Sequence, residues 1–458
     1  MPHSPASDPS PRSGAPSLAR TMGLGALIIY GVGDMLGAGI YALIGRAAGL
    51  MGNAVWLAFL VSMLAALLTG LSYASLGSRY PRAAGAAYVT HRAFGHSFLT
   101  YVLGLSVVAS GLTSFATQSR AFAGYFLGLI GVPEVTPALI AVVALGFILL
   151  LAAINFRGMR ESIWLNALCT TVEVVGLLIV IAVGVRYWGS VDYLETPQTG
   201  VASGGISFPL VLQGAVLTFY AFVGFEDMIN VSEEVKNPRR NFPIAVVIAL
   251  ATTTVIYLAV GITAVSVLHY TELGASTQPL VDVVVRAAPG FPSIVFSCIA
   301  LFAIVNTGLL NYIMGSRVVY GMARQGFVPR VLGRVHPTRR TPHIAILVLM
   351  LIVAALALSG NIGQLASATS VLLLGVFIIV NASLLVLQRR RDEPKGAFEI
   401  PAIVPALGIV VCAVLLFHAR REALATAGIL LAGIALLYFL MRPKQVQAEP
   451  EDGAGEVG

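Results

Sequence analysis

The sequence predicts an all-α integral membrane protein with about twelve transmembrane helices. Of its 458 residues, 57% are hydrophobic and 11% are charged, and the mean hydropathy is +0.87. A soluble domain is roughly one-quarter charged, so this composition favours a chain surrounded mostly by lipid. About twelve stretches are apolar over the roughly 20 residues that a helix needs to cross the hydrocarbon core. Almost no chain remains for a soluble catalytic domain.

Short polar segments separate the apolar stretches and define the expected spans. The spans are 22–48, 53–77, 95–130, 137–155, 162–187, 206–235, 241–268, 290–323, 342–358, 362–388, 401–418 and 421–441. The first 20 residues are rich in Ser and Pro and lack an apolar core. We therefore expect them to form a disordered cytoplasmic tail rather than a signal peptide.

The distribution of basic residues predicts the orientation in the membrane. With the N-terminus inside, the outer segments contain six arginines, and all other Lys and Arg residues are cytoplasmic or juxtamembrane. The six are Arg46, Arg120, Arg186, Arg286, Arg420 and Arg421. This is the positive-inside bias, and it predicts a multi-pass protein of the cell membrane with both termini in the cytoplasm. The net charge of +7 therefore reflects membrane topology, and we expect no nucleic-acid partner.

The three cysteines and seven histidines give no sign of a metal site or cofactor. Cys169, Cys298 and Cys412 lie singly in apolar stretches, and the histidines lie in the tail or at span ends. The histidines do not form the set of metal ligands or catalytic groups that an intramembrane enzyme needs, so we expect no enzyme. No phosphate-binding GxxxxGK[ST] motif is present, so we expect no ATP-driven pump.

The stretch GDMLGAGIYALIG, residues 33–45, places glycines and a carboxylate in the first span. Glycine is among the poorest helix formers, and an acid within the membrane is a functional candidate. Gly37 and Gly39 predict a break here, and Gly224 in AFVGFED predicts a second break in the sixth span. Breaks at matching positions of two halves indicate a transporter built from inverted repeats, with its binding site at the breaks.

Two facing breaks suit a zwitterionic ligand. The N-terminus of a half-helix favours a carboxylate, and unwound carbonyls favour an ammonium group or a cation. The alternative is that the glycines merely permit close helix packing. We expect a ten-helix core over 21–390 with repeats at about 21–188 and 205–390, two peripheral transmembrane helices over 391–442, and a cytoplasmic tail over 443–458.

Three stretches resemble the amino acid, polyamine and organocation (APC) permeases. They are GAGIY in the first span, SLGSRYPRAAGAAY after the second, and FYAFVGFEDMINVSEEVKNPRRNFP through the sixth. The resemblance covers spans one to ten. It implies a leucine-transporter-type (LeuT-type) 5+5 inverted repeat with discontinuous helices 1 and 6, which moves amino acids or related amines by alternating access.

The resemblance also implies the residues of a substrate site. The substrate carboxylate would contact the backbone N–H groups of Ala38, Gly39 and Ile40. The amino group would lie near the carbonyls of Met35, Tyr220 and Val223. Tyr220, Phe222 and Phe225 would form an aromatic wall or gate. Ordinary bundle packing is the alternative for these aromatic side chains. Many relatives have Ser where this chain has Ala38, so one side-chain donor is missing.

Glu173 is the first candidate for ion coupling. It shares one helix face with Asn166 and Thr170 through i, i+4, i+7 spacing. A carboxyl group in apolar surroundings holds a proton more readily, as a proton carrier must. Some proton-coupled relatives have a lysine where our alignment puts Glu173. The alternative is a neutral structural residue hydrogen-bonded between helices.

Further coupling candidates are Asp34, Asn306 and Thr307. Glu226 and Asp227 lie at the start of the second half of span six, where acids also serve as helix caps. Polar stripes on the third and eighth spans either line a pathway or hydrogen-bond between helices. These stripes are Ser106, Ser110, Thr113 and Thr117, and Thr307, Asn311 and Gly315.

These observations favour a secondary active transporter, with proton-coupled symport ahead of sodium-independent exchange. The alternative from a different class is a polar-solute channel, which saturable uptake would exclude. Asp34 and Glu173 favour cationic or neutral substrates over acidic ones, because a further carboxylate would be repelled. The expected partners are a small amino acid or amine, protons and the lipid bilayer; the sequence does not give the oligomeric state.

Overall fold

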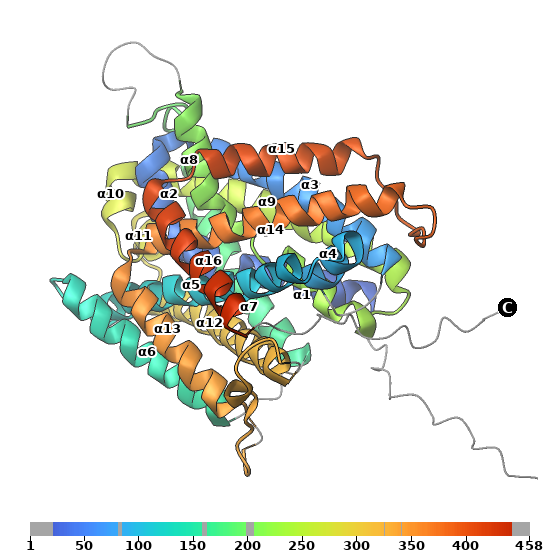
Figure 1. Ribbon diagram of the computed structural model, residues 1–458. Coiled ribbons are helices and arrows are strands. Elements are labelled where there is room, and N and C mark those ends of the chain that lie inside the picture. Colours follow the sequence, from blue (N-terminus) through green and yellow to red (C-terminus); the bar gives the residue numbers. More distant parts are fainter. Residues whose placement is uncertain are drawn as a thin grey trace, which may run out of the picture.

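The computed structural model describes residues 22–80, 85–157, 163–197, 206–324, 326–339 and 341–441, without the side chains of residues 163–167, 230, 233 and 234. Helices dominate these ranges, and no strand is present in them beyond an isolated bridge between Met22 and Val235 (Figure 1). Both predicted tails, residues 1–20 and 443–458, lie outside the described residues.

The α-helices follow the predicted spans closely. They are α1 (Leu24–Leu36), α2 (Ala38–Met51), α3 (Val55–Arg79), α4 (Gly85–Phe94), α5 (Ser97–Leu129), α6 (Pro137–Arg157), α7 (Ile163–Gly184), α8 (Phe208–Phe219), α9 (Pro238–Val267), α10 (Tyr270–Ala275), α11 (Pro279–Ala287), α12 (Ser293–Arg324), α13 (His343–Ser359), α14 (Ile362–Arg389), α15 (Ile403–Phe417) and α16 (Arg421–Met441). Five 3₁₀ segments join them: η1 (Gly52–Ala54), η2 (Val185–Tyr187), η3 (Tyr220–Phe222), η4 (Phe225–Glu234) and η5 (Arg330–Gly333). The short helices α4, α10 and α11 were not predicted.

In the part of the chain that the structure describes, nine helical segments are long and apolar enough to cross a membrane. One of them, Leu24–Arg79, contains α1, α2 and α3, and α13 and α15 are shorter apolar helices. Helix α6, for example, has 21 residues and so extends about 30 Å, the thickness of a hydrocarbon core. The all-helical membrane class is therefore confirmed, whereas the count of twelve spans stays a prediction.

The helices that surround the two predicted breaks form the most buried part of the bundle. Helix α3 packs along α9 and α8, and the long α5 packs along α12 and α14. Helices α6 and α13 lie side by side at the lower left of Figure 1, and α16 crosses α5 and α14. The interior position of α1, α2 and α8 is what places their breaks away from lipid.

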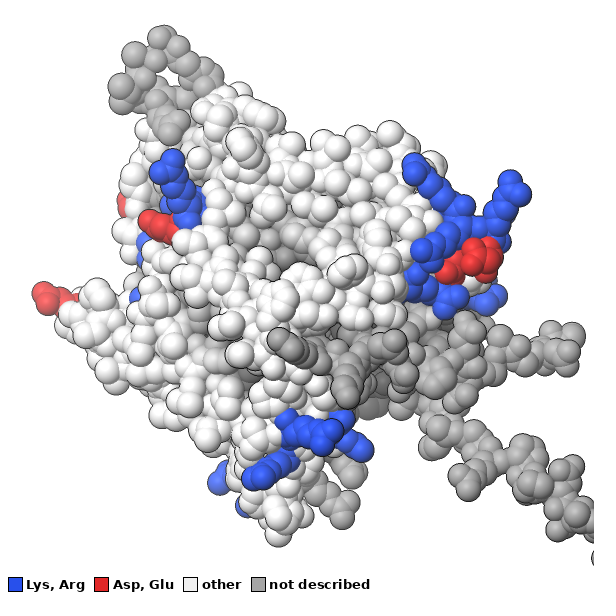
Figure 2. All heavy atoms as spheres, in the orientation of Figure 1, with Lys and Arg blue, Asp and Glu red and all other residues white. Residues whose placement is uncertain are grey.

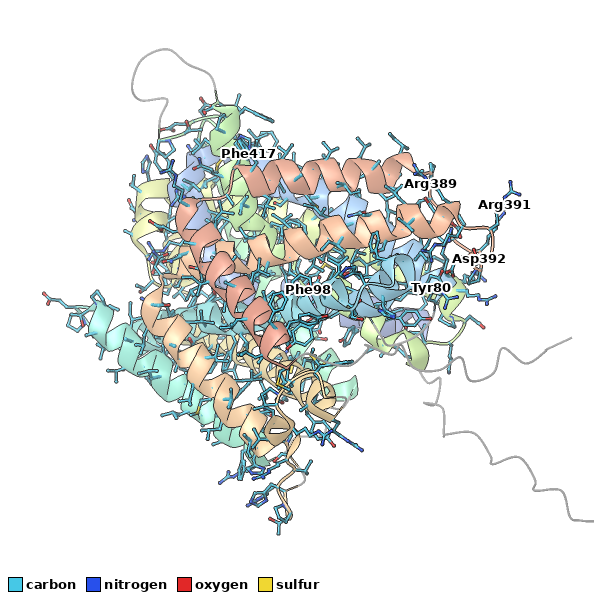
Figure 3. All side chains as sticks on the ribbon, viewed as in Figure 1. Tyr80, Phe98, Arg389, Arg391, Asp392 and Phe417 are labelled. Carbon is cyan, nitrogen blue, oxygen red and sulfur yellow. The ribbon has the colours of Figure 1, made fainter. Side chains whose placement is uncertain are left out.

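The outer helices expose large apolar side chains. Phe417 at the end of α15 is 84% exposed (Figure 3), and similar side chains project from the other peripheral helices. Further examples are Val142 and Leu149 on α6, Leu351 on α13, and Ile429 and Phe439 on α16. A soluble monomer rarely exposes so continuous an apolar surface, but lipid tails accept it.

Charged residues gather where the chain leaves α14. Figure 2 shows basic and acidic side chains together at this end, and Figure 3 labels Arg389, Arg391 and Asp392 there. Nearby, Glu393 accepts hydrogen bonds from Tyr80 Oη and Arg92 Nε, each at 2.7 Å. Burial and the bond to Glu393 raise the pKa of Tyr80, so its hydroxyl keeps its proton. The segment after α14 is thereby tied to α3 and α4.

Candidate substrate site at two helix breaks

The first break separates α1 from α2 at one residue. Gly37 has φ −55° and ψ −147°, and its neighbours on both sides are helical. The Ala38 N–H, which the break leaves without a helical acceptor, donates to Thr307 Oγ1 of α12 at 3.1 Å. A Cβ atom on Gly37 would lie 2.1 Å from that hydroxyl. Because Gly37 has no side chain, Thr307 of α12 can approach closely enough to accept a hydrogen bond from the Ala38 N–H at the start of α2.

Gly39, predicted as a break residue, is instead helical and lies in the first turn of α2. Its physical role is close approach, because a Cβ atom there would lie 2.9 Å from the Cα atom of Ala221. Gly37 alone interrupts the helix, and Gly39 lets the segment around Ala221 pack closely against α2.

The second break is longer. Helix α8 ends at Phe219, η3 follows, and Gly224 then adopts φ +127° before η4 begins. The Gly224 N–H donates to Glu226 Oε2 at 2.9 Å, so this acid caps the break, in agreement with the capping alternative. A Cβ atom on Gly224 would lie 2.9 Å from the carbonyl carbon and oxygen of Asp34.

The two breaks are in contact with each other. Gly224 lies against Asp34 of α1, and Gly39 of α2 lies against Ala221. The Tyr257 hydroxyl of α9 donates to the Met35 carbonyl and lies 2.8 Å from the Ala221 carbonyl oxygen. Backbone groups near both breaks are therefore held by one side chain.

The candidate substrate residues are almost all buried. Met35, Ala38, Ile40, Tyr220, Phe222 and Phe225 are each at most 3% exposed, Gly39 is also buried, and Val223 is half-buried. Phe225 packs against Tyr73 and Phe377 with ring centroids 5.9 and 5.2 Å apart. Phe222 packs against Phe59 and Tyr257. Both phenylalanines thus also serve as core, and the wall or gate role stays a prediction.

Tyr220 belongs to a polar cluster that the sequence analysis missed. Its hydroxyl lies 2.9 Å from Ser114 Oγ and 3.4 Å from Gln118 Nε2 of α5. Asn311 Nδ2 of α12 donates to Ser114 Oγ at 3.3 Å. Gln118 Oε1 is buried without a hydrogen-bond partner among the described residues. The spacing of Ser114 and Gln118, four residues apart, is the signal that could have identified this second face of α5.

The hydroxyls of the predicted stripe on α5 bond mostly within their own helix. Ser106, Ser110 and Thr117 are buried, and their hydroxyls donate to carbonyls of their own helix. Thr113 does so too, and it also lies 2.7 Å from Thr369 Oγ1 of α14. Of the four residues, Thr113 shows the hydrogen bond between helices that the alternative predicts. A pathway role for the stripe stays a prediction. On α12, Thr307 and Asn311 do reach the sites described above.

Glu173 is on α7, next to α2 and α12, and it is fully buried. Asn306 Nδ2 donates to its Oε1 at 3.2 Å, and the Tyr41 hydroxyl donates to its backbone carbonyl at 3.0 Å. Glu173 Oε2 has no hydrogen-bond partner among the residues that the structure describes. On the same face of α7, Thr170 lies against Gly33 of α1; the side chain of Asn166 is outside the described set.

Two consecutive residues of α12 link the acid to the first break. Asn306 contacts Glu173, and Thr307 contacts the Ala38 N–H. The Glu173 carboxyl group is therefore connected to the start of α2 by two hydrogen bonds, Glu173 to Asn306 and Thr307 to Ala38, and by the peptide bond between Asn306 and Thr307.

Comparison with known sequences decides the family. A sequence model of the family described as amino acid permease matches residues 23–441. The chain belongs to this family. Among its relatives, the methylthioribose transporter of Bacillus subtilis (strain 168) is 28% identical over 95% of this chain and 96% of the relative. The branched-chain amino acid permease BcaP of the same organism is 25% identical over 89% of each.

A mammalian transporter is also similar to this chain. Cationic amino acid transporter 4 of Mus musculus is 30% identical over 83% of this chain and 62% of the relative. The family and the apolar helices together make this permease a multi-pass membrane protein, and they support amino acid transport as its general activity.

Proposed function

We propose that this permease is a secondary active transporter that moves amino acids or related amines by alternating access, with uptake coupled to protons. Twelve spans would form a leucine-transporter-type core of ten helices plus α15 and α16, with both termini in the cytoplasm. The observation that carries the proposal is the contact between the two helix breaks, which brings Gly39 against Ala221 and Gly224 against Asp34.

The chemistry of the breaks supports a zwitterionic substrate. The first turn of α2 presents the N–H groups of Ala38, Gly39 and Ile40, whose partial positive charge suits a carboxylate. The carbonyls of Met35, Tyr220 and Val223 lie at the ends of interrupted segments and suit an ammonium group.

Substrate binding would exchange one set of hydrogen bonds for another. Thr307 holds the Ala38 N–H and Tyr257 holds the Met35 carbonyl in this structure. Backbone groups away from water cost several kcal/mol when unpaired, so each must keep a partner. A substrate that replaces Thr307 and Tyr257 at these groups would release α12 and α9 from the breaks.

Glu173 is the proposed proton carrier. It is buried, and its second carboxyl oxygen has no partner among the described residues. Loss of its proton would leave a charge in an apolar interior, which is unfavourable unless a partner moves toward it. The path through Asn306 and Thr307 would pass that change to the first break.

The acids of the site and the names of the relatives both bear on the charge and chemical class of the proposed substrate. Asp34 and Glu173 disfavour an additional carboxylate, so we propose neutral or cationic amino acids before acidic ones. The names of the relatives include a branched-chain permease and a cationic transporter, which agrees with this range. A relative named for methylthioribose gives a reason to include a neutral thiosugar in any assay.

The test is uptake of a labelled panel of amino acids, amines and methylthioribose into proteoliposomes in sodium-free buffer, with and without an inward proton gradient. We expect saturable uptake of neutral amino acids that the gradient drives to accumulation. Uptake that ignores the gradient and requires internal amino acid would replace symport by exchange. Flux that does not saturate would favour a channel, and no uptake of any amino acid or amine would refute the proposed substrate class.

A further inference from the structure

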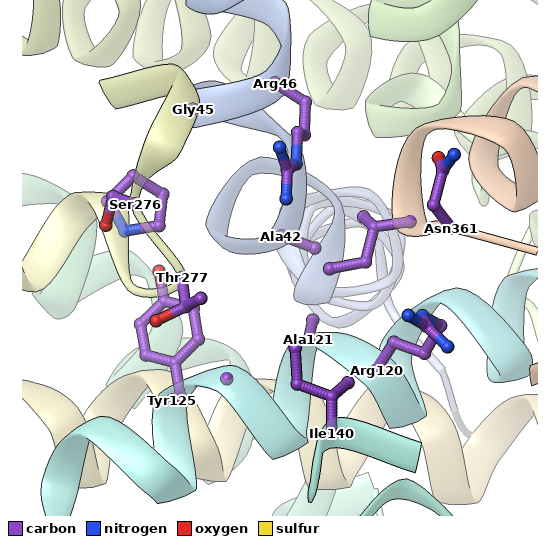
Figure 4. Close-up of a pocket in the computed structure, with 13 residues that line it drawn as sticks. Ala42, Gly45, Arg46, Arg120, Ala121, Tyr125, Ile140, Ser276, Thr277 and Asn361 are labelled. Carbon is purple, nitrogen blue, oxygen red and sulfur yellow. The ribbon is translucent and has the colours of Figure 1, made fainter. Parts of the chain in front are cut away.

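A separate cavity lies beyond the first break, farther along α2. Its volume is about 60 Å³, and its walls come from α2, α5, α6, the segment between α10 and α11, and the start of α14 (Figure 4). One water needs about 10–15 Å³ of such space, so the cavity has room for a carboxylate group with one or two waters.

Two arginines enter this cavity from different helices. Figure 4 shows Arg46 of α2 and Arg120 of α5 among the side chains around it. Arg46 Nη1 donates to the Gly274 carbonyl at 3.0 Å, and Arg120 Nη1 donates to the Ala357 carbonyl at 2.7 Å. These bonds hold each side chain in place without neutralising it. The two guanidinium groups are close enough to repel each other.

No acid balances this charge within the cavity wall. The other lining side chains are neutral, and neither arginine forms an ion pair within the described part of the chain. Arg120 Nε is buried without a hydrogen-bond partner in that same part. Behind the wall, Asp282 accepts a hydrogen bond from the lining residue Ser276. The cavity is therefore a positively charged pocket with an unused donor.

The position of the cavity suits an entry site. Ala42 and Arg46 lie four and eight residues after Ala38 on α2, which is about 6 and 12 Å along the helix from the first break. The cavity is at the start of α14, whereas the basic cluster at Arg389 is at its other end, about 40 Å away. In the proposed orientation, the cavity therefore faces the outside.

We propose that this cavity is an outer subsite for the carboxylate of an arriving amino acid, with Arg46 and Arg120 as its ligands. This inference rests on the proposed function. Arginine side chains donate strong charge-assisted hydrogen bonds to a carboxylate, including that of an amino acid with no net charge. The subsite would favour neutral amino acids over amines that lack a carboxylate, and over amino acids with a second cationic group.

The test compares two probes, leucine and 3-methylbutylamine, which is leucine without its carboxylate. The variants are Arg46→Gln, Arg46→Lys and the control Arg286→Gln. Arg286 is also predicted to be outside, but it is exposed, pairs with Glu272 and does not line the cavity. Arg46 is the better target of the two ligands because it is exposed, so its replacement disturbs packing least.

We expect Arg46→Gln to raise the KM for leucine about fivefold, with the maximal rate and the inhibition constant of 3-methylbutylamine unchanged. Arg46→Lys and Arg286→Gln should behave like the wild type. Raising the ionic strength from about 0.01 to about 0.15 M should raise the KM of the wild type more than that of Arg46→Gln, because the variant keeps only the charge of Arg120 for salt to screen. A purely structural role would not produce this difference in salt dependence.

Three outcomes would overturn the subsite. Equal leucine KM values in the wild type and Arg46→Gln would do so while leaving the proposed function intact. A KM that depends on chloride at constant ionic strength would assign the cavity to an inorganic anion instead. Failure of the wild type to take up any amino acid would refute the proposed function, and the subsite with it.

Discussion

The two helix breaks differ in how they are made. The first interrupts the helix at Gly37 alone. The Ala38 N–H group, which then lacks a helical acceptor, donates to the side chain of Thr307 on another helix. The second extends through η3 and η4, and an acid from its own segment, Glu226, satisfies the N–H of Gly224. The N–H group at the first break thus depends on a distant helix, whereas the N–H group at the second break is capped within its own segment.

This difference suggests a division of roles. A break held by α12 responds to changes at α12, which also contacts Glu173. A break held by its own acid and by a positive φ keeps its shape when neighbouring helices shift. We infer that the first break is the responsive half of the site and the second is the fixed half.

The largest expected effect comes from Gly224→Ala. The positive φ strains any side chain by about 1–3 kcal/mol, and the new Cβ atom would meet the Asp34 backbone at 2.9 Å. Backbone cannot rotate away as a side chain can, so the two breaks must separate. We expect uptake to fall about 100-fold, as for other misplacements of about 1 Å.

Gly37→Ala tests the other half of the comparison. Its Cβ atom would meet the Thr307 side chain, which can rotate, so we expect a loss of uptake about tenfold smaller than for Gly224→Ala. Gly375→Ala in α14 is the matched control, because nothing lies within 4 Å of its added Cβ atom. Equal losses for Gly37→Ala and Gly224→Ala would remove the distinction between the breaks.

Thr307→Val should reduce uptake about tenfold. It keeps the shape of the side chain but leaves the Ala38 N–H without its acceptor, and a buried donor without a partner costs about 1–3 kcal/mol. Thr307→Ser keeps the hydroxyl and should retain most of the activity. The measurement compares the transport rates of the two variants with that of the wild type, and thermal unfolding in detergent checks that both variants fold. A fully active Thr307→Val would show that the first break does not depend on α12.

Tyr257→Phe should have a smaller effect, about three- to tenfold, on uptake. The change removes the hydroxyl that contacts the Met35 and Ala221 carbonyls, and a hydrogen bond contributes about 0.5–1.5 kcal/mol net. Since this hydroxyl serves both breaks, the effects of Tyr257→Phe and Thr307→Val should not add. Additive losses in the double variant would mean that the two side chains act on separate states.

Ser106→Ala and Ser110→Ala should change uptake by less than about twofold, because these hydroxyls donate to their own helix. Ser114→Ala on the same helix should reduce it more, since Ser114 contacts Tyr220 and Asn311. Kinetic constants for the three variants measure this contrast. A larger loss for Ser106→Ala would restore the predicted stripe as a pathway.

Much of the fold could be predicted from the sequence because it follows from local composition. Hydropathy located the long helices within a few residues but missed α4, α10 and α11, and the glycines of 37–39 and 224 marked the interruptions. The sequence did not show which of Gly37 and Gly39 interrupts the helix. The two glycines are distinguished by their neighbours in other segments, Thr307 for Gly37 and Ala221 for Gly39.

The polar partners were harder to predict. Tyr257, Ser114 and Gln118 look like ordinary helix residues, and their contacts depend on how α9 and α5 are rotated about their axes. Rotation is set by packing against distant helices, which the periodicity of one segment does not contain. Ser106 and Ser110 are regularly spaced, but the spacing does not show that their hydroxyls bond to their own helix.

The most direct test of proton coupling at the breaks measures proton movement together with substrate. A pH-sensitive dye inside proteoliposomes would report acidification when leucine, or the best neutral substrate of the panel, is added outside, for the wild type and for Glu173→Gln. We predict acidification with the wild type and none with Glu173→Gln, while exchange of labelled for unlabelled amino acid continues in both. Acidification by Glu173→Gln at the rate of the wild type would contradict Glu173 as the proton carrier.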